Sequence, residues 1–361
     1  MQVMRDLSYV GGEPKLEATL KQEFSDFQVD EELGFELAGE GDHLWLNVRK
    51  TDLSTTDVAR RLAEGCGVKL KTIGYSGMKD RRGECTQWFS LPLTSQEEAK
   101  LVNVEGDGLV EVLQTQRNTR KLKIGSHKSN HFKILLRNCA GSRLDFDQRL
   151  DSVKALGAPN YFGLQRFGRN MSNMAQVEAL MEQALKPEAD VIALRGQMGR
   201  VKRGMLFSAA RSYVFNHLLS KRIRDGNWNS YVAGDVLNLN GTSRFFAPRE
   251  PEVWDSELQR RLEEFDIHIS GPLAGKKDSK DRYASSSEAA DMEEVVLKEF
   301  ELLVKGLAHF DVLASRRSLR FLPVDLSWNW PDTDTSDLLI EFKLPRGTYA
   351  TSLLREICLT G

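Results

Sequence analysis

The chain has 361 residues, of which 40% are hydrophobic and 28% are charged, a globular composition that excludes disordered and collagen-like chains. Its 50 Lys and Arg residues face 52 Asp and Glu residues, so the net charge of -2 excludes the uniform basicity of a histone-like protein. At roughly 150 residues per domain the length indicates two domains or one domain with a large insertion, and any nucleic acid must bind to local basic patches.

The first 156 residues have a mixed α+β pattern. Alternating apolar residues predict a strand over 44–48, and apolar positions at helical spacing predict a helix over 54–64. Further extended segments are expected over 71–75, 86–91, 109–114 and 132–136, followed by a helix over 145–156. This part of the chain therefore contains more strand than helix.

The pattern changes after Pro159. Helical periodicity covers 172–185, 207–224 and 286–307 with few convincing strands between them, and a loop rich in Gly, Lys, Asp and Ser occupies 271–287. A strand over 337–344 and a short helix over 349–357 follow. Because the roughly 40 residues after Phe321 are too few for a core of their own, we expect them to complete the N-terminal sheet. The helical middle is then an insertion.

Charges are sorted along the chain. Residues 23–42 carry eight carboxylates and no Lys or Arg, whereas 117–137 carry seven Lys or Arg residues and 191–224 carry eight, both without an acid. A shorter basic group consists of Arg316, Arg317 and Arg320. This separation favours a polyanionic partner, because each neutralised phosphate releases counterions. The alternative is that folding brings acidic and basic segments together as ion pairs.

Signals for disulfides, metals and membrane spans are missing. The four cysteines form no CxxC pair, which favours reduced thiols in a cytoplasm. No apolar stretch approaches the ~18 residues that cross a bilayer. His127, His131 and Cys139 lack the spacing of a zinc site, and the sequence has no phosphate-binding loop. We expect a cytoplasmic protein with no bound metal and no membrane association.

One glycine-flanked turn has the residue types of a catalytic site. In the segment 77–83, GMKDRRG, Asp80 lies between basic residues that would hold its carboxylate ionised from ~4–6 Å. An ionised carboxylate in a basic groove can act as a nucleophile or a base. The same residue types also occur in plain surface turns, so the pattern alone leaves both interpretations open.

Five segments, in the same order and over nearly the whole chain, resemble one known family. Residues 77–88, GMKDRRGECTQW, are similar to the GxKDxxAxTxQ signature of the TruD family of tRNA pseudouridine synthases, and residues 20–31, LKQEFSDFQVDE, resemble its LKxxPxDFxVxE opening. Residues 160–168, NYFGLQRFG, resemble its NYFGxQRFG segment, and 326–330 and 344–356 resemble its last strand and helix. The departures are Phe24, Gly83 and Cys85, where the family has Pro, Ala and Thr.

The resemblance implies an α+β protein, in which a pseudouridine-synthase domain with a mixed or antiparallel sheet is interrupted by a largely helical TRUD domain to give a V-shaped molecule. The expected catalytic domain comprises residues 1–156 and 322–361, and the expected insertion comprises 157–321. The implied reaction turns a uridine in the D arm of a tRNA, uridine-13, into pseudouridine. It uses neither a metal nor a nucleotide cofactor.

Carried over position by position, the resemblance makes Asp80 the catalytic carboxylate and assigns Phe27, Asn130 and Tyr349 to substrate binding. Tyr349 stands where Phe is more common. The reaction breaks the N1–C1′ bond, turns the uracil and rejoins it through C5, so the base must leave its stack, and aromatic rings suit the extruded base. Asp80 can attack C1′, add to the base or remove the C2′ proton, and these routes stay open.

Further candidates come from charge. Lys21 is the candidate ion-pair partner of Asp80, and a solvated surface lysine is its alternative. The candidates for phosphate contacts are Arg166, Arg169, Arg200, Lys202 and Arg203.

Two functions are alternatives to the tRNA-modifying enzyme: an RNA-binding or RNA-folding protein without turnover, and a hydrolase that pairs Asp80 with a second acid. The intact Asp80 argues against an RNA-binding protein without turnover, and the lack of a second carboxylate motif argues against a hydrolase.

Overall fold

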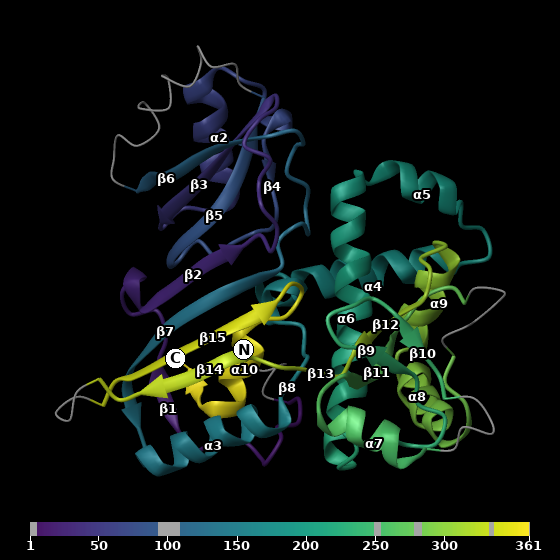
Figure 1. Ribbon diagram of the computed structural model, residues 1–361. Helices are drawn as coiled ribbons and strands as arrows, with labels where there is room; N and C mark the ends of the chain where they lie inside the picture. The colour runs from purple at the N-terminus through teal and green to yellow at the C-terminus, as the bar shows by residue number, and fades with distance from the viewer. Residues whose placement is uncertain (1–5, 93–108, 249–253, 278–283, 332–335, 361) are drawn as a thin grey trace. The chain divides into compact units, whose positions relative to one another are not determined.

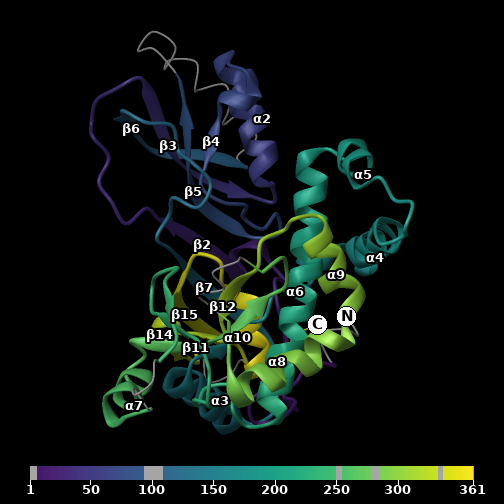
Figure 2. The same ribbon diagram turned by 90° about the vertical axis from the view of Figure 1, so that its right-hand side faces the viewer.

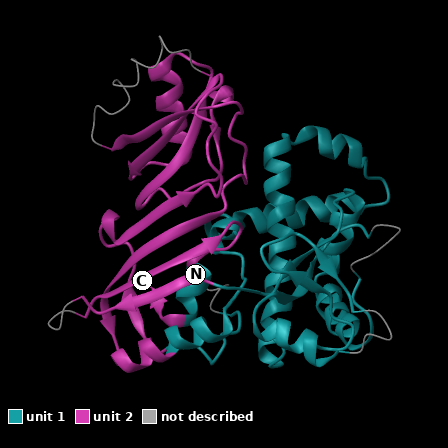
Figure 3. Ribbon diagram, viewed as in Figure 1, with its two compact units in different colours: residues 1–14, 149–322, 351–356 teal, residues 15–148, 323–350, 357–361 magenta. Residues whose placement is uncertain are grey.

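The computed structural model describes residues 6–92, 109–248, 254–277, 284–331 and 336–360 (Figure 1). The chain divides into two compact units (Figure 3). Unit 1 comprises residues 1–14, 149–322 and 351–356, and unit 2 comprises 15–148, 323–350 and 357–361. None of the helices in the described residues is long and apolar enough to cross a membrane.

Unit 2 is built on one mixed sheet. Its strands are β1 (Glu17–Thr19), β2 (Phe27–Glu32), β3 (His43–Thr51), β4 (Gly74–Tyr75), β5 (Glu84–Leu91), β6 (Val110–Asn118), β7 (Ser129–Ala140), β14 (Val324–Asn329), β15 (Leu338–Pro345) and β16 (Leu359–Thr360). The main path runs β14-β15-β7-β2-β5-β3-β6. Most neighbours are antiparallel, but β2 is parallel to β5 and β1 is parallel to β16. β15 pairs with β7 from Leu338 opposite Leu136 to Pro345 opposite Ser129, so the C-terminal segment completes the sheet, as predicted.

Helix α2 (Thr55–Cys66) packs on this sheet. A capping box begins it, because the Ser54 hydroxyl accepts from the Asp57 backbone N–H and the Asp57 carboxylate accepts from the Ser54 N–H. Leu62 of the helix and Leu46 of β3 are buried in the same cluster. Burial of such a side chain contributes about 1.5–3 kcal/mol. The helices α3 (Arg143–Leu156) and α10 (Ala350–Ile357) each contribute residues to both units.

Unit 1 is mainly helical. Its helices are α4 (Ser172–Ala184), α5 (Val191–Gln197), α6 (Arg200–Arg224), α7 (Ser256–Glu263), α8 (Ser287–Glu299) and α9 (Glu301–His309). Its strands are β8 (Ala158–Pro159), β9 (Leu237–Leu239), β10 (Phe245–Phe246), β11 (Ile267–Leu273), β12 (Ser315–Ser318) and β13 (Arg320–Phe321). Helix α6 lies beside α4 and α9 (Figure 2) and also contacts β11. The approach to β11 is close, since a Cβ on Gly271 would lie 2.5 Å from Leu218 Cδ2.

The expected α+β class is confirmed, with local corrections. The strand predicted over 71–75 is a short 3-10 helix, η2 (Leu70–Thr72), followed by β4. The helix predicted over 207–224 begins earlier, at Arg200, and the one predicted over 286–307 is two helices broken at Phe300. The sheet β10-β9-β11-β12 was missed in the helical half. Its first and last members have two and four residues, too few for an alternating pattern to stand out.

Candidate functional site

The glycine-flanked turn lies between β4 and β5 of unit 2, as predicted. Gly83 ends it with φ at +154°, and a Cβ at this position would lie 2.7 Å from the backbone oxygen of Phe27. Glycine therefore lets β5 start directly beside β2. Within the turn neighbouring side chains point opposite ways: Lys79 is buried, while 49% of the Asp80 side chain is exposed.

Lys21 holds the carboxylate of Asp80. Its Nζ lies 2.9 Å from Asp80 Oδ2 and 3.8 Å from the centroid of the Phe27 ring, so the ammonium is placed between an anion and an aromatic face. The expected ion pair is thus present. Because both side chains reach solvent, the pair stabilises the fold by no more than about 1 kcal/mol. Lys21 also has a φ of +60°, an uncommon conformation for a side chain of this size.

Lys50 holds the backbone of the same residue. Its Nζ donates to the carbonyl oxygen of Asp80 at 2.6 Å and to that of Leu53 at 2.7 Å, and the residue is 0% exposed. The Cys85 thiol lies beside it, with Sγ 3.6 Å from the same Asp80 oxygen. Burial lowers the pKa of Lys50 and raises the pKa of Cys85. Sequence reasoning missed Lys50, although the alternation of Leu44, Leu46 and Val48 in β3 places residue 50 on the same buried face.

Two of the basic neighbours of Asp80, Lys79 and Arg81, pair with other acids, contrary to expectation. The Nζ of Lys79 lies 2.8 Å from Glu31 Oε2 and donates to Asn130 Oδ1, and Arg81 Nε lies 3.2 Å from Asp52 Oδ1. The Lys79 and Glu31 side chains are both buried. A buried pair of this kind adds little net stability, but removing one partner costs about 3–5 kcal/mol. Lys79 is buried, whereas Asp80 and Arg81 are exposed, so residues that are adjacent in sequence lie in different surroundings.

Asn130 connects Lys79 to His127 and Ser76. Asn130 Nδ2 lies 3.4 Å from His127 Nε2, and His127 Nδ1 lies 2.6 Å from Ser76 Oγ. Burial lowers the pKa of His127, the charges of Lys79 and Arg346 add to this, and that of Glu31 opposes it. Among the described residues no group of three or more His, Cys, Asp or Glu side chains could hold a metal ion.

The two aromatic candidates lie in different surroundings. Phe27 is 1% exposed, with its edge packed on Phe132 at 6.1 Å between ring centroids. Tyr349 is half-buried in the segment after β15, near the end of that strand where Leu344 pairs with Asn130. The structure therefore brings Lys21, Phe27 and Asp80 into contact and ties Asn130 to Lys79.

The candidate phosphate contacts in unit 1 divide into exposed and structural residues. Arg200 and Lys202 are exposed in the first turn of α6, and Arg169 is exposed in the short helix η5 (Arg169–Met171). Arg203 is half-buried and donates to the backbone oxygen of Arg195 at 2.9 Å, at the end of α5. Arg166 is also half-buried, and its Nη1 donates to Ser208 Oγ at 3.0 Å. The last two residues therefore also connect elements of unit 1.

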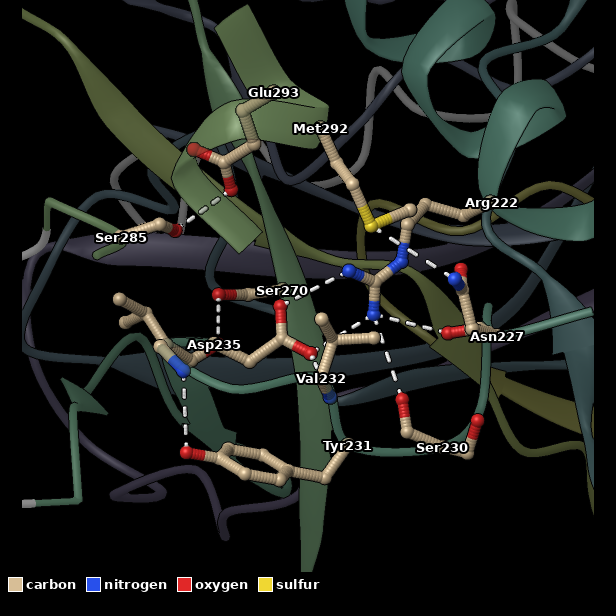
Figure 4. A network of polar contacts seen from close by, with 12 residues as sticks. Arg222, Asn227, Ser230, Tyr231, Val232, Asp235, Ser270, Ser285, Met292 and Glu293 are labelled. Carbon is tan, nitrogen blue, oxygen red and sulfur yellow. Dashed lines mark hydrogen bonds and ion pairs between the residues drawn. The ribbon is translucent and has the colours of Figure 1, made fainter. Parts of the chain in front are cut away.

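Several basic residues bind acids inside the fold. Figure 4 shows the Arg222 guanidinium facing the Asp235 carboxylate, with two hydrogen bonds of 3.1 and 2.8 Å. Arg316 is buried against Glu293, and Arg137 Nη2 lies 2.8 Å from Asp26 Oδ1. A phosphate-facing role is wrong for Arg316 and Arg320, because both are buried. The ion-pair alternative holds for Arg137, Arg222 and Arg316, whereas Arg320 donates to His268 and to the Leu262 carbonyl oxygen.

Comparisons with known proteins agree on one family. The family model for tRNA pseudouridine synthase D (TruD) matches residues 5–190 and 171–357. A tRNA pseudouridine synthase D of Nitrosococcus oceani is 41% identical over 354 residues, 98% of this chain and 94% of the relative. One of Pseudomonas aeruginosa is 38% identical over 361 residues, 99% and 96% of the two chains. A crystal structure from Methanosarcina mazei, of a protein assigned to the same family, superposes with a TM-score of 0.71 at 23% identity over 98% of this chain and 94% of that one, and supports the fold.

Proposed function

The chain belongs to the TruD family of tRNA pseudouridine synthases, isomerases that form pseudouridine from uridine, and on that premise we propose that it acts on the D arm of tRNA, at uridine-13, with Asp80 as its catalytic carboxylate. The observation that carries this proposal is the way Asp80 is held. Lys21 binds its carboxylate and Lys50 binds its carbonyl oxygen, while half of the side chain faces solvent.

A carboxylate held in this way suits the reaction. Breaking the N1–C1′ bond creates positive character at C1′, which a nearby carboxylate stabilises or attacks, as in glycoside cleavage. Lys21 places a positive charge 2.9 Å from the carboxylate that this chemistry uses. The hydrolase alternative needs a second acid, and Glu31, the nearby buried carboxylate, is bound to Lys79 and to the Trp88 backbone N–H.

Phe27, Asn130 and Tyr349 are proposed to contact the extruded uridine. A base that leaves its stack loses a few kcal/mol, and a ring that stacks on it recovers about 1–3 kcal/mol. The Phe27 ring is covered by Lys21 and Phe132 in this structure. Stacking on this face of Phe27 therefore requires the Lys21 side chain, which is 18% exposed, to move off the ring.

The exposed cations of unit 1 are proposed to bind tRNA phosphates. The first turn of α6 carries Arg200, Lys202 and Arg203 and no acid. Cations at the positive end of a helix dipole destabilise the helix, so their presence there favours a binding role over a stabilising one. Arg169 and Arg166 would add to the same function. We retain residues 1–156 and 322–361 as the proposed catalytic domain and 157–321 as the proposed insertion, which forms most of the mainly helical unit 1.

The proposal is tested by incubating the protein with unmodified tRNA transcripts and mapping pseudouridine by carbodiimide probing and primer extension. We expect one modified position, uridine-13, with the wild-type protein. A transcript in which this uridine is replaced by cytidine is the matched control and should give no product. Modification outside the D arm would refute the proposed site.

A further inference from the structure

A chain of hydrogen bonds behind Asp80 has only one consistent direction. The Lys79 ammonium can only donate, so the atom of Asn130 that faces it must be the carbonyl oxygen Oδ1. The amide nitrogen Nδ2 of Asn130 then faces His127 Nε2 at 3.4 Å, and since Nδ2 also only donates, Nε2 must be an unprotonated acceptor. The single ring hydrogen of a neutral His127 therefore lies on Nδ1 and is donated to Ser76 Oγ at 2.6 Å.

We propose that His127, as the neutral imidazole with its hydrogen on Nδ1, is a positioning residue for the reaction. It orients the amide of Asn130 and, through it, the Lys79 ammonium and the backbone that leads to Asp80. This inference rests on the proposed catalytic role of Asp80. It adds a residue that acts through Asn130 and does not touch the substrate.

Hydrogen bonds of this network hold the glycine-flanked turn at two residues, Ser76 and Lys79. At its start the Ser76 hydroxyl accepts from the backbone N–H of His127 at 2.7 Å, and the Ser76 carbonyl oxygen accepts from the Gly125 N–H at 2.6 Å. Three residues later, Lys79 is bound by Asn130 and Glu31. The residue that follows, Asp80, leaves the buried network and reaches solvent. A change in the Asn130 amide is thus transmitted to the residue next to Asp80.

The charges around the ring favour this neutral state. His127 is buried and faces Lys79 from the turn, Glu31 from β2 and Arg346 from the segment after β15. Two of these three groups are cations, and they act with burial to lower the pKa of the ring. Protonation would place an N–H on Nε2 against the N–H of Asn130 Nδ2 and add a cation near Lys79. The amide cannot escape by rotating, because its nitrogen would then face the Lys79 ammonium.

The test uses single-turnover rates with enzyme in excess over tRNA, measured from pH 5 to 8 for His127→Leu and His127→Gln. Leucine fills the volume but offers no acceptor. At pH 7 to 8 we expect the rate constant to fall at least tenfold, with tRNA Kd within twofold of wild type, and the two rates should converge in acid. Glutamine offers an acceptor oxygen that does not titrate. We expect it to restore the rate to within about threefold of wild type and to remove the fall in rate in acid that we expect of wild type.

His131→Gln is the matched control, because His131 lies four residues further on, in β7, half-exposed beside Glu341. It should keep the wild-type rate and pH profile. The proposal is overturned if His127→Leu turns over like wild type at pH 7 to 8, or if His127→Gln keeps the wild-type loss of rate in acid.

A second measurement does not depend on activity. The ¹⁵N shifts of the His127 ring at pH 7 should show a protonated Nδ1 and an unprotonated Nε2, and the opposite tautomer or a charged ring would also overturn the proposal. If the tautomer is as expected but Asp80→Asn remains active, the proposed function fails while the hydrogen-bond direction stands. The two failures are therefore distinguishable.

Discussion

The buried ammonium of Lys50 donates to the backbone carbonyl oxygen of Asp80 at 2.6 Å. A second lysine, Lys21, binds the carboxylate itself at 2.9 Å. The backbone and the side chain of Asp80 are thus held independently. The contact from Lys50 positions the backbone of the residue, and the contact from Lys21 positions its carboxylate.

Lys50→Met removes the first of these contacts while keeping the length of the side chain. The carbonyl oxygen of Leu53 loses this donor, and that of Asp80 keeps only the weak Cys85 thiol, at about 1–3 kcal/mol each. We expect the free energy of unfolding to fall by about 2–4 kcal/mol and the single-turnover rate to fall at least tenfold at temperatures where the variant is folded. Lys69→Met, at an exposed position, is the control. A folded Lys50→Met protein with the wild-type rate would show that the contact has no part in positioning Asp80.

Phe27→Leu separates the role of the ring from that of the core. Truncation to alanine would cost about 3–5 kcal/mol through the cavity it leaves, whereas leucine keeps most of the volume. We expect turnover to fall more than tenfold with tRNA affinity within threefold, because affinity comes mainly from phosphate contacts. Phe132→Leu changes the neighbouring ring, 6.1 Å away, and should alter stability with little effect on turnover. Equal effects of the two substitutions would make Phe27 a core residue.

Reversing the charges of Arg200 and Lys202 to Glu tests the proposed tRNA surface of unit 1. An acidic side chain in the first turn of α6 stabilises the helix by about 0.3–1 kcal/mol through its interaction with the helix dipole. The variant should therefore be at least as stable as wild type. We expect weaker tRNA binding and a log–log salt slope smaller by about one unit per lost phosphate contact.

The control for that variant is the double reversal of Lys298 and Lys305, which changes the net charge equally on α8 and α9. It should leave the salt slope close to that of wild type. An unchanged slope for the variant at Arg200 and Lys202 would place this turn away from the RNA.

Glu356 makes the stability of unit 1 depend on pH. Burial raises its pKa from 4.5 to about 7, although Arg355 and the Val10 N–H bind the carboxylate and oppose the shift. Because the folded protein holds this proton more tightly than the unfolded chain, the contribution of Glu356 to the free energy of unfolding is fully present below pH 4.5. This contribution is lost as the pH rises to about 7. Glu356→Gln cannot titrate, so between pH 4.5 and 7.5 wild type should lose roughly 3 kcal/mol relative to the variant. Urea unfolding measures the difference, with exposed Glu178→Gln as control, and a constant difference would contradict the shift.

The sequence was most informative where structure is local. The apolar spacing over 54–64 predicts α2, and the glycines around Asp80 predict the turn, because both signals depend on residues that are close in sequence. Contacts between distant segments could not be predicted. Charge separation alone does not show that Arg137 meets Asp26, 111 residues away. The same holds for Lys79, whose partners Glu31 and Asn130 come from β2 and β7.

Lys50 and His127 were not predicted as part of the site, although the sequence contains patterns that involve both residues. The alternation of β3 continues through residue 50, which places a lysine on the buried face of the strand. A buried ammonium needs hydrogen-bond acceptors, and those of Lys50 are the carbonyl oxygens of Leu53 and Asp80. From the sequence His127 is considered as a candidate metal ligand, whereas in the structure its ring hydrogen-bonds to Ser76 and Asn130. Nothing in the spacing of these residues shows their orientation, because it depends on how the segment before β7 folds onto the turn.

The single-turnover rate of Asp80→Asn tests the central claim most directly. Asparagine has nearly the shape of aspartate and leaves the carbonyl oxygen available to Lys50, but it lacks the charge that attack or proton removal requires. With the variant in excess over tRNA, affinity and product release do not enter the rate. We expect no detectable pseudouridine, with tRNA bound as tightly as by wild type. A rate within a few-fold of wild type would contradict the catalytic role of Asp80 and the mechanism built on it.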